Sequence, residues 1–328
     1  MTDMNTPMLP NQLELDTAAT MFSLSFCDNH RSLIRISVTM NEDVDIMILQ
    51  SALNTIIPRF HMTFDDLAIC AFKVFTTENQ VILEYFHAIS DGYGGSVFLK
   101  SLIAEYIRIR YAVSISYSSE VFNIKEEPKK EEIQDGYSEI AGSAGKIKDM
   151  SFAYSVKGEK DKKLHITELT FHTDELLRCA SEYGVTLTAF LSGVLTLALF
   201  DLQKQDKRTQ KEIRLSIPID LRRRFQRNSL RNFTLATTIY AGKLKEETPF
   251  SNLGVWSLPD NLTPYIQQCS MAFTPKPSTP YSCAVVSAKN KLILTLTRSI
   301  KEPLLESRII QILEKILSNN ITQLELIA

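Results

Sequence analysis

The spacing of apolar positions in the first half of the chain predicts three strands and two helices. Alternation and β-branched side chains predict strands at residues 31–39, 67–75 and 80–86, the last two joined as a hairpin. Apolar side chains at helical spacing predict amphipathic helices at residues 44–57 and 96–110. Strands and helices therefore share this half of the chain.

The second half repeats this mixture. Strands are expected at residues 164–171, 213–219, 233–240, 282–287 and 291–297. Helices are expected from Asp174 onward, within the apolar run 185–202, and at residues 303–317. Strands interleaved with helices predict layered α/β or α+β halves rather than a helical bundle.

A stretch of different character separates the two halves. Residues 117–161 are rich in Lys, Glu, Ser and Gly and contain few consecutive apolar residues, which is typical of a linker or a mobile surface crossover. For the Lys/Glu run at 125–132 a solvated surface helix is an equal alternative. We therefore divide the chain into an N-terminal half (1–116), a linker (117–161) and a C-terminal half (162–328).

Composition narrows the classes of function. The 328 residues carry a net charge of −2 with both signs mixed, and no basic stripe indicates nucleic-acid binding. The five cysteines form no CxxC pair, and the histidines lack partners at ligand spacing, so we expect reduced thiols and no metal site. The first 16 residues lack the basic and apolar regions of a signal peptide, and polar residues interrupt the run 185–202, which we interpret as a buried core helix. We expect a cytoplasmic protein without a membrane span.

The candidate chemistry is centred on His87, at the end of the strand predicted at 80–86. Asp91 follows four residues later, and Gly92, Gly94 and Gly95 come next, before the helix. A neutral imidazole can take a proton from an alcohol or amine that attacks a carbonyl. An isolated histidine of this kind is usually a packed or surface residue; here the strand before it and the glycine-rich turn after it favour catalysis. Asp91 either supports the imidazole or anchors the loop.

Residues 84–95 together with 98–102 resemble the active-site segment of the chloramphenicol acetyltransferase-like superfamily, which includes the HxxxD plant acyltransferases and the condensation domains of peptide synthetases. Residues 16–19, 217–225 with 231–233, and 251–254 resemble, in the same order, segments of bacterial alcohol acetyltransferase-like proteins. The resemblance implies a fold of two similar α/β halves with the active site in a tunnel between them, which agrees with the linker assigned independently.

The resemblance also implies residue roles. His87 corresponds to the general base, which deprotonates an alcohol or amine acceptor as it attacks a thioester. That thioester, acyl-CoA or an acyl group on a carrier protein, would be a co-substrate, and no cofactor would be permanently bound. Asp91 and Gly92 correspond to structural residues of the site. Ser251 or Asn252 is a candidate for binding the oxyanion or substrate, and a plain turn is the equal alternative.

In the resemblance the structural aspartate pairs with an arginine. We nominate Arg222 for this role, with Arg223 and Arg224 as substitutes. Without the resemblance, the three arginines are typical of a solvated surface cluster.

Two departures from the family pattern leave a second function open. Phe86 stands where many members have a second histidine, and the chain is shorter than members of the bacterial group, with compact junctions at residues 60–67 and 240–249. The first hypothesis is an acyltransferase with His87 as its base. The alternative is a catalytically weakened or inactive relative that acts as a binding or assembly protein.

Overall fold

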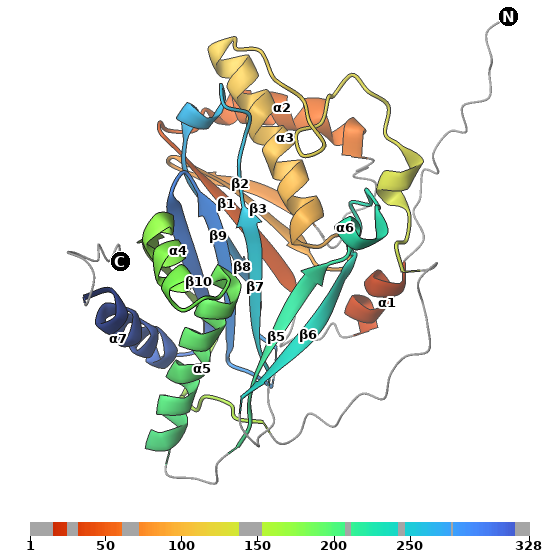
Figure 1. The fold of residues 1–328 in the computed structure, drawn as a ribbon. Coiled ribbons are helices and arrows are strands. Elements are labelled where there is room, and N and C mark those ends of the chain that lie inside the picture. Colours follow the sequence, from red (N-terminus) through yellow and green to blue (C-terminus); the bar gives the residue numbers. More distant parts are fainter. Residues whose placement is uncertain are drawn as a thin grey trace, which may run out of the picture.

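The computed structural model describes residues 16–24, 32–60, 72–137, 153–206, 211–241, 247–276 and 278–318. These residues form two β-sheets with helices packed on them (Figure 1). The start of the strand predicted at 67–75, most of the junctions at 60–67 and 240–249, and residues 138–152 of the predicted linker lie outside the described part or have no described side chains.

The first sheet is antiparallel and has the strand order β2-β3-β1-β8. Its strands are β1 (Leu33–Met40), β2 (Phe72–Thr77), β3 (Gln80–Phe86) and β8 (Ile266–Phe273). The helices α2 (Ile46–Ile56) and α3 (Gly92–Tyr111) pack on one another beside this sheet (Figure 1). The side chain of Asp45 caps α2 by accepting a hydrogen bond from the backbone of Ile48.

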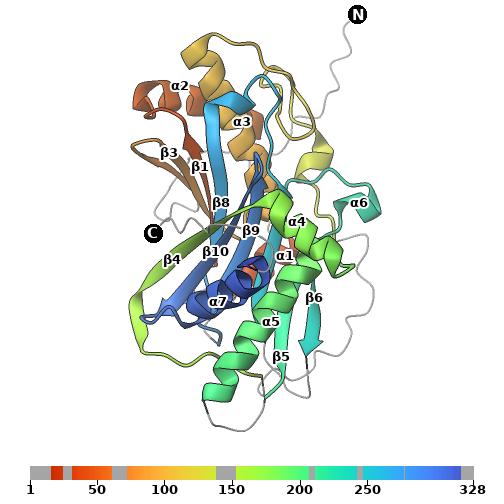
Figure 2. The same ribbon diagram turned by 60° about the vertical axis from the view of Figure 1, so that its left-hand side comes forward.

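The second sheet has the order β4-β10-β9-β7-β5-β6, and β7 runs parallel to both of its neighbours. Its strands are β4 (Lys160–His172), β5 (Ile213–Asp220), β6 (Thr234–Ala241), β7 (Glu247–Val255), β9 (Tyr281–Ala288) and β10 (Lys291–Ile300). Its helices are α4 (Thr173–Glu182), α5 (Leu187–Gln205) and α7 (Leu304–Ser318), which lie together on one side of the sheet (Figure 2). The remaining elements are short: α1 (Thr17–Leu24), α6 (Arg222–Phe225), η1 (Ile57–Phe60), η2 (Lys130–Ile133) and η3 (Thr263–Tyr265).

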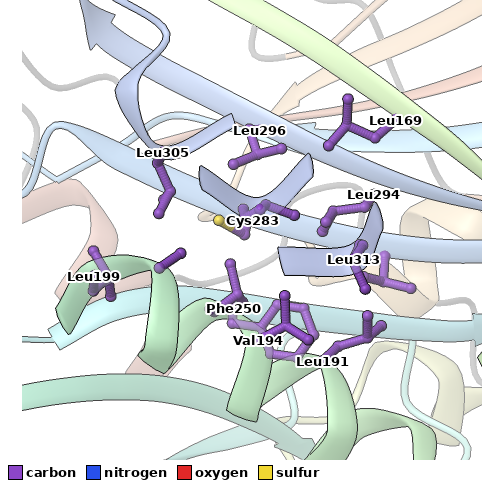
Figure 3. Close-up of a cluster of buried hydrophobic side chains, with 14 of the residues drawn as sticks. Leu169, Leu191, Val194, Leu199, Phe250, Cys283, Leu294, Leu296, Leu305 and Leu313 are labelled. Carbon is purple, nitrogen blue, oxygen red and sulfur yellow. The ribbon is translucent and has the colours of Figure 1, made fainter. Parts of the chain in front are cut away.

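One of the two hydrophobic cores lies between the second sheet and helices α5 and α7. Leu191 of α5 and Leu313 of α7 meet Phe250, Cys283 and Leu294 of the sheet (Figure 3). Burying a leucine side chain of this kind stabilises the fold by roughly 1.5–3 kcal/mol. By length and composition α5 could cross a membrane, but half of its apolar window is buried inside the structure. Its packing is therefore that of the core helix predicted from the sequence.

Strand β8 forms an edge of the first sheet although it comes late in the chain. It pairs with β1 over residues 34–40, and Met271 and Cys269 enter the core of the first sheet. Trp256, which follows β7, is buried in the same core. The boundaries 1–116, 117–161 and 162–328 stay a prediction, but in space the first sheet is completed by a strand from the C-terminal half.

The described part of the crossover is held against the first sheet's helices. The guanidinium of Arg59 binds the carboxylate of Glu132 through two hydrogen bonds of 2.7 and 2.9 Å, and both side chains are buried. The Lys/Glu run is not a surface helix: its regular part is the short η2, which contains Glu132. The sequence suggested that the Lys/Glu run is solvated, because Arg59, the partner of Glu132, lies 73 residues away.

The two halves approach closely at Gly94 in α3, where a Cβ would stand 2.1 Å from the backbone oxygen of Leu230. We predict that Gly94→Ala destabilises the protein, because backbone cannot move aside as a flexible side chain can. Gly193→Ala in α5 is the matched control: it has open space around its Cβ position and should stabilise by up to about 1 kcal/mol through helix propensity. Urea unfolding measures both, and equal stability of the two variants would contradict the close approach.

Candidate functional site

His87 directly follows β3, and its backbone is fixed from both sides. Its N–H donates to the carbonyl of Ser32 over 2.8 Å. The side-chain amide of Asn232 donates to the carbonyl of His87 over 2.8 Å and approaches that of Ala88 at 3.4 Å. Because Asn232 comes just before β6, the second half of the chain positions the backbone at the candidate base.

The imidazole of His87 is half-buried. The ring of Phe22 stacks on it with 4.0 Å between centroids and an interplanar angle of 16°. Its Nδ1 atom is buried and has no hydrogen-bond partner among the described residues. Burial lowers the pKa of His87 below its usual value, while hydrogen bonding to its own backbone and the charge of Asp91 oppose that shift. The imidazole is therefore neutral at pH 7, as a general base requires.

The carboxylate of Asp91 is fully engaged away from His87. Its Oδ1 accepts from the backbone of Gly94 over 3.2 Å and so caps α3. Its Oδ2 accepts from the backbone of Phe233 over 2.9 Å. Arg222 donates to both oxygens, Nη1 to Oδ2 over 2.9 Å and Nη2 to Oδ1 over 3.0 Å. Four donors surround this carboxylate, so its geometry is that of an anchor for the loop.

The guanidinium of Arg222 is buried, and the described structure gives it further acceptors. Its Nε donates to the carbonyl of Ser229 over 2.7 Å, Nη2 donates to that of Arg231 over 2.6 Å, and Nη1 donates to Asp220 over 2.9 Å. A two-pronged arginine–carboxylate pair of this kind fixes orientation as well as distance. Arg223 and Arg224, the two substitutes named from the sequence, are exposed.

Tyr85 and two glycines shape the turn after His87. The hydroxyl of Tyr85 donates to the backbone carbonyl of Asp91 over 2.7 Å. A Cβ at Gly95 would stand 2.2 Å from that hydroxyl oxygen, so the helix start requires glycine there. Gly92 begins α3 and lies beside Leu253 of β7, which places the helix start against the second sheet.

Asn252 and Ser251 of β7 have different surroundings. The amide of Asn252 donates to the hydroxyl of Thr188 over 3.0 Å, and its oxygen accepts from the backbone of Gly254 over 2.8 Å. The side chain of Asn252 is thus hydrogen-bonded within its own turn and to Thr188 of α5. Ser251 is half-buried on the alternate face of β7 and stays the candidate for the oxyanion.

Two small hollows lie in the described part of the chain, and His87 is in the lining of neither of these two. The first, of about 50 Å³, lies between α3 and the end of β7 and includes Tyr93, Lys100 and Trp256. The second, of about 100 Å³, lies between η2 and α6. Within the described ranges, no group of three His, Cys, Asp or Glu side chains could hold a metal ion.

Sequence reasoning assigned no role to Phe22, Tyr85 or Asn232. Asn232 lies in a stretch that contributed to the resemblance, but an asparagine between β5 and β6 carries no sign that it reaches His87. Tyr85 alternates like any buried strand residue. Phe22 lies 65 positions before His87, and apolar periodicity in so short a helix does not indicate what it contacts.

The chain is similar to known proteins in structure, whereas comparison by sequence finds no match. No family model matches the chain, and no curated protein matches its sequence. Polyketide synthase associated protein 5 from Mycobacterium tuberculosis is 12% identical, with a TM-score of 0.61 over 94% of this chain and 99% of that one. The starter condensation domain of rhizomide synthetase, solved as a mutant in complex with C8-CoA, is 10% identical, with a TM-score of 0.59 over 96% and 97%.

A third structure is trichothecene 15-O-acetyltransferase from Fusarium sporotrichioides, which is 10% identical, with a TM-score of 0.56 over 93% of this chain and 95% of that one. The chain shares the condensation-domain fold. This confirms the predicted α/β class with two chloramphenicol acetyltransferase-like halves. At such identities the likeness establishes fold alone, and a closer relation to bacterial alcohol acetyltransferase-like proteins stays a prediction.

We predict that Arg222→Met lowers the free energy of unfolding by about 3–5 kcal/mol, because it leaves the buried carboxylate of Asp91 without its counter-charge. Arg223→Met, on the same short helix, is the control and should change it by less than about 0.5 kcal/mol. Denaturant titrations of both variants test this. Equal effects would show that the pair does not hold the halves together.

Proposed function

We propose that this protein is an acyltransferase that moves an acyl group from a thioester to an alcohol or amine, with His87 as the general base. One observation carries the proposal. The neutral, half-buried imidazole of His87 lies at the end of β3, and Asn232 from the second half donates a hydrogen bond to the backbone carbonyl of His87. The shared fold with condensation domains and an O-acetyltransferase supports acyl transfer as the reaction class.

The proposed reaction balances with His87 alone as the proton carrier. Nδ1 is buried without a hydrogen-bond partner among the described residues, so we assign the proton transfer to Nε2. Nε2 takes the proton of the acceptor hydroxyl or amine as the acceptor's oxygen or nitrogen bonds to the thioester carbonyl carbon. The tetrahedral oxyanion then collapses and breaks the carbon–sulfur bond. The imidazolium returns its proton to the departing thiolate, and Ser251 is the proposed hydrogen-bond donor to the oxyanion.

The donor and the acceptor are proposed by class. Acyl-CoA is the donor we favour, since a structure with the same fold was solved with C8-CoA; an acyl group on a carrier protein offers the same thioester. An alcohol acceptor is suggested by the similar 15-O-acetyltransferase. A cytoplasmic location, where CoA thioesters are made, fits this reaction and stays a prediction.

The direct test compares wild type with His87→Ala across a panel of acyl-CoA donors and of alcohols and amines, with thiol release as the readout. Loss of a general base typically lowers the rate 10²- to 10⁴-fold. His172→Ala, an exposed histidine at the end of β4, is the matched control and should retain full activity. Equal turnover by His87→Ala and wild type would exclude His87 as the base. Absence of turnover with every pair, including carrier-bound donors, would favour the binding or assembly alternative.

The pH profile of kcat/KM gives a second prediction. The base works in its neutral form, and burial holds the pKa of His87 below the ordinary value of about 6.5. Activity should therefore be highest on the alkaline side and fall as the imidazole is protonated, with the midpoint of the acidic limb below about pH 6.5. An acidic limb with its midpoint above pH 6.5 would contradict the buried, neutral base.

A further inference from the structure

The side chain of Phe22 covers one face of the candidate base. Its ring lies nearly parallel to that of His87, with 4.0 Å between the two centroids and an angle of 16° between the planes. Phe22 belongs to α1, which precedes the first sheet in sequence. The stack therefore brings a third segment of the chain to the site.

Polar contacts at its first turn fix α1 in place. Asp16, which is buried, caps the helix through the backbone of Ala19 and pairs with Arg231. The backbone and hydroxyl of Thr17 donate to the carboxylate of Asp135 over 3.2 and 3.0 Å. The carbonyl of Arg231 in turn accepts from Arg222. The network that anchors Asp91 thus also sets the position of Phe22.

The apolar side chains of α1 differ in direction. Met21 is 58% exposed and Leu24 is 82% exposed, whereas Phe22 is half-buried against the imidazole. Ala18 and Ala19 are buried but too short to cover a ring. Phe22 is therefore the side chain through which the described part of α1 meets His87.

We propose that Phe22 is a positioning residue for the general base: it holds the plane of the His87 ring and excludes water from one face, so that Nε2 alone is presented to the acceptor. This inference rests on the proposed function. In other sites a carboxylate orients the imidazole. Here the carboxylate of Asp91 is hydrogen-bonded to Arg222 and two backbone amides, so Phe22 takes over the orienting role.

Removing the ring has two opposite effects on protonation. Water reaching the imidazole favours the charged form, whereas losing an aromatic face, which attracts a cation, disfavours it. Burial is the largest influence on His87, and Asp91, neutralised by Arg222, is the main charged group acting on it. We therefore expect the first effect to dominate and the pKa of His87 to rise toward about 6.5 in Phe22→Ala.

The experiment compares Phe22→Ala, Phe22→Tyr and Met21→Ala in the full chain. The pKa of His87 is measured by NMR on histidine-labelled protein, with its signal among the five histidines assigned from the His87→Ala variant. Phe22→Ala should raise this pKa and lower kcat by about tenfold to 10²-fold, with a smaller change in KM, since misplacing a reacting group costs up to about that much. Phe22→Tyr keeps a flat ring and should restore both values, and Met21→Ala, on the exposed side of α1, should change neither.

The outcomes separate this inference from the proposed function. Unchanged pKa and kcat in Phe22→Ala, while His87→Ala still abolishes turnover, would overturn the role of Phe22 and leave His87 as the base. Equal losses in Phe22→Ala and Met21→Ala would show that α1 acts only through its own stability, which also overturns it. The pKa measurement needs no turnover, so it decides the positioning role even if His87 proves not to be the base.

Discussion

The structure depends on the buried pair between Asp91 and Arg222. Asp91 caps the start of α3 in the first half of the chain, and Arg222 begins α6 in the second, 131 positions away. Each is buried, and a lone charge in that position would be costly, so neither half can leave the other without exposing or stranding a charge. The pair stabilises the junction mainly through the penalty for breaking it, and its two-pronged geometry fixes the register of the halves.

Neighbouring contacts reinforce that register. Gly94 admits the backbone of Leu230, and Asn232 reaches back to the carbonyl of His87. The histidine itself makes no ion pair with Asp91, so scaffold and chemistry are assigned to different side chains four residues apart. A strand end, a turn and a helix start suffice to place them because the second half supplies three of the four donors to the carboxylate of Asp91, and α3 supplies the fourth.

The sequence predicted the local elements well and the long-range partners unevenly. Strong periodicity gave β1, β3, α3, β10 and α7 close to their observed bounds. β8 (IQQCSMAF) and β7 (ETPFSNLGV) were missed, because glutamines, a proline and a glycine interrupt their alternation. Arg222 was named as partner of Asp91 only through the family resemblance, since a triplet of arginines otherwise indicates surface. Phe22 and Asn232 could not be found, because their roles arise from contacts that no local pattern encodes.

The central claim is that His87 performs chemistry while Asp91 holds structure, and comparing Asp91→Asn with His87→Ala tests it most directly. For each variant, the free energy of unfolding and the turnover per folded molecule are measured at the same temperature. We predict that Asp91→Asn loses several kcal/mol of stability and retains most activity when folded, whereas His87→Ala keeps its stability and loses turnover. Full stability with abolished turnover in Asp91→Asn would contradict it.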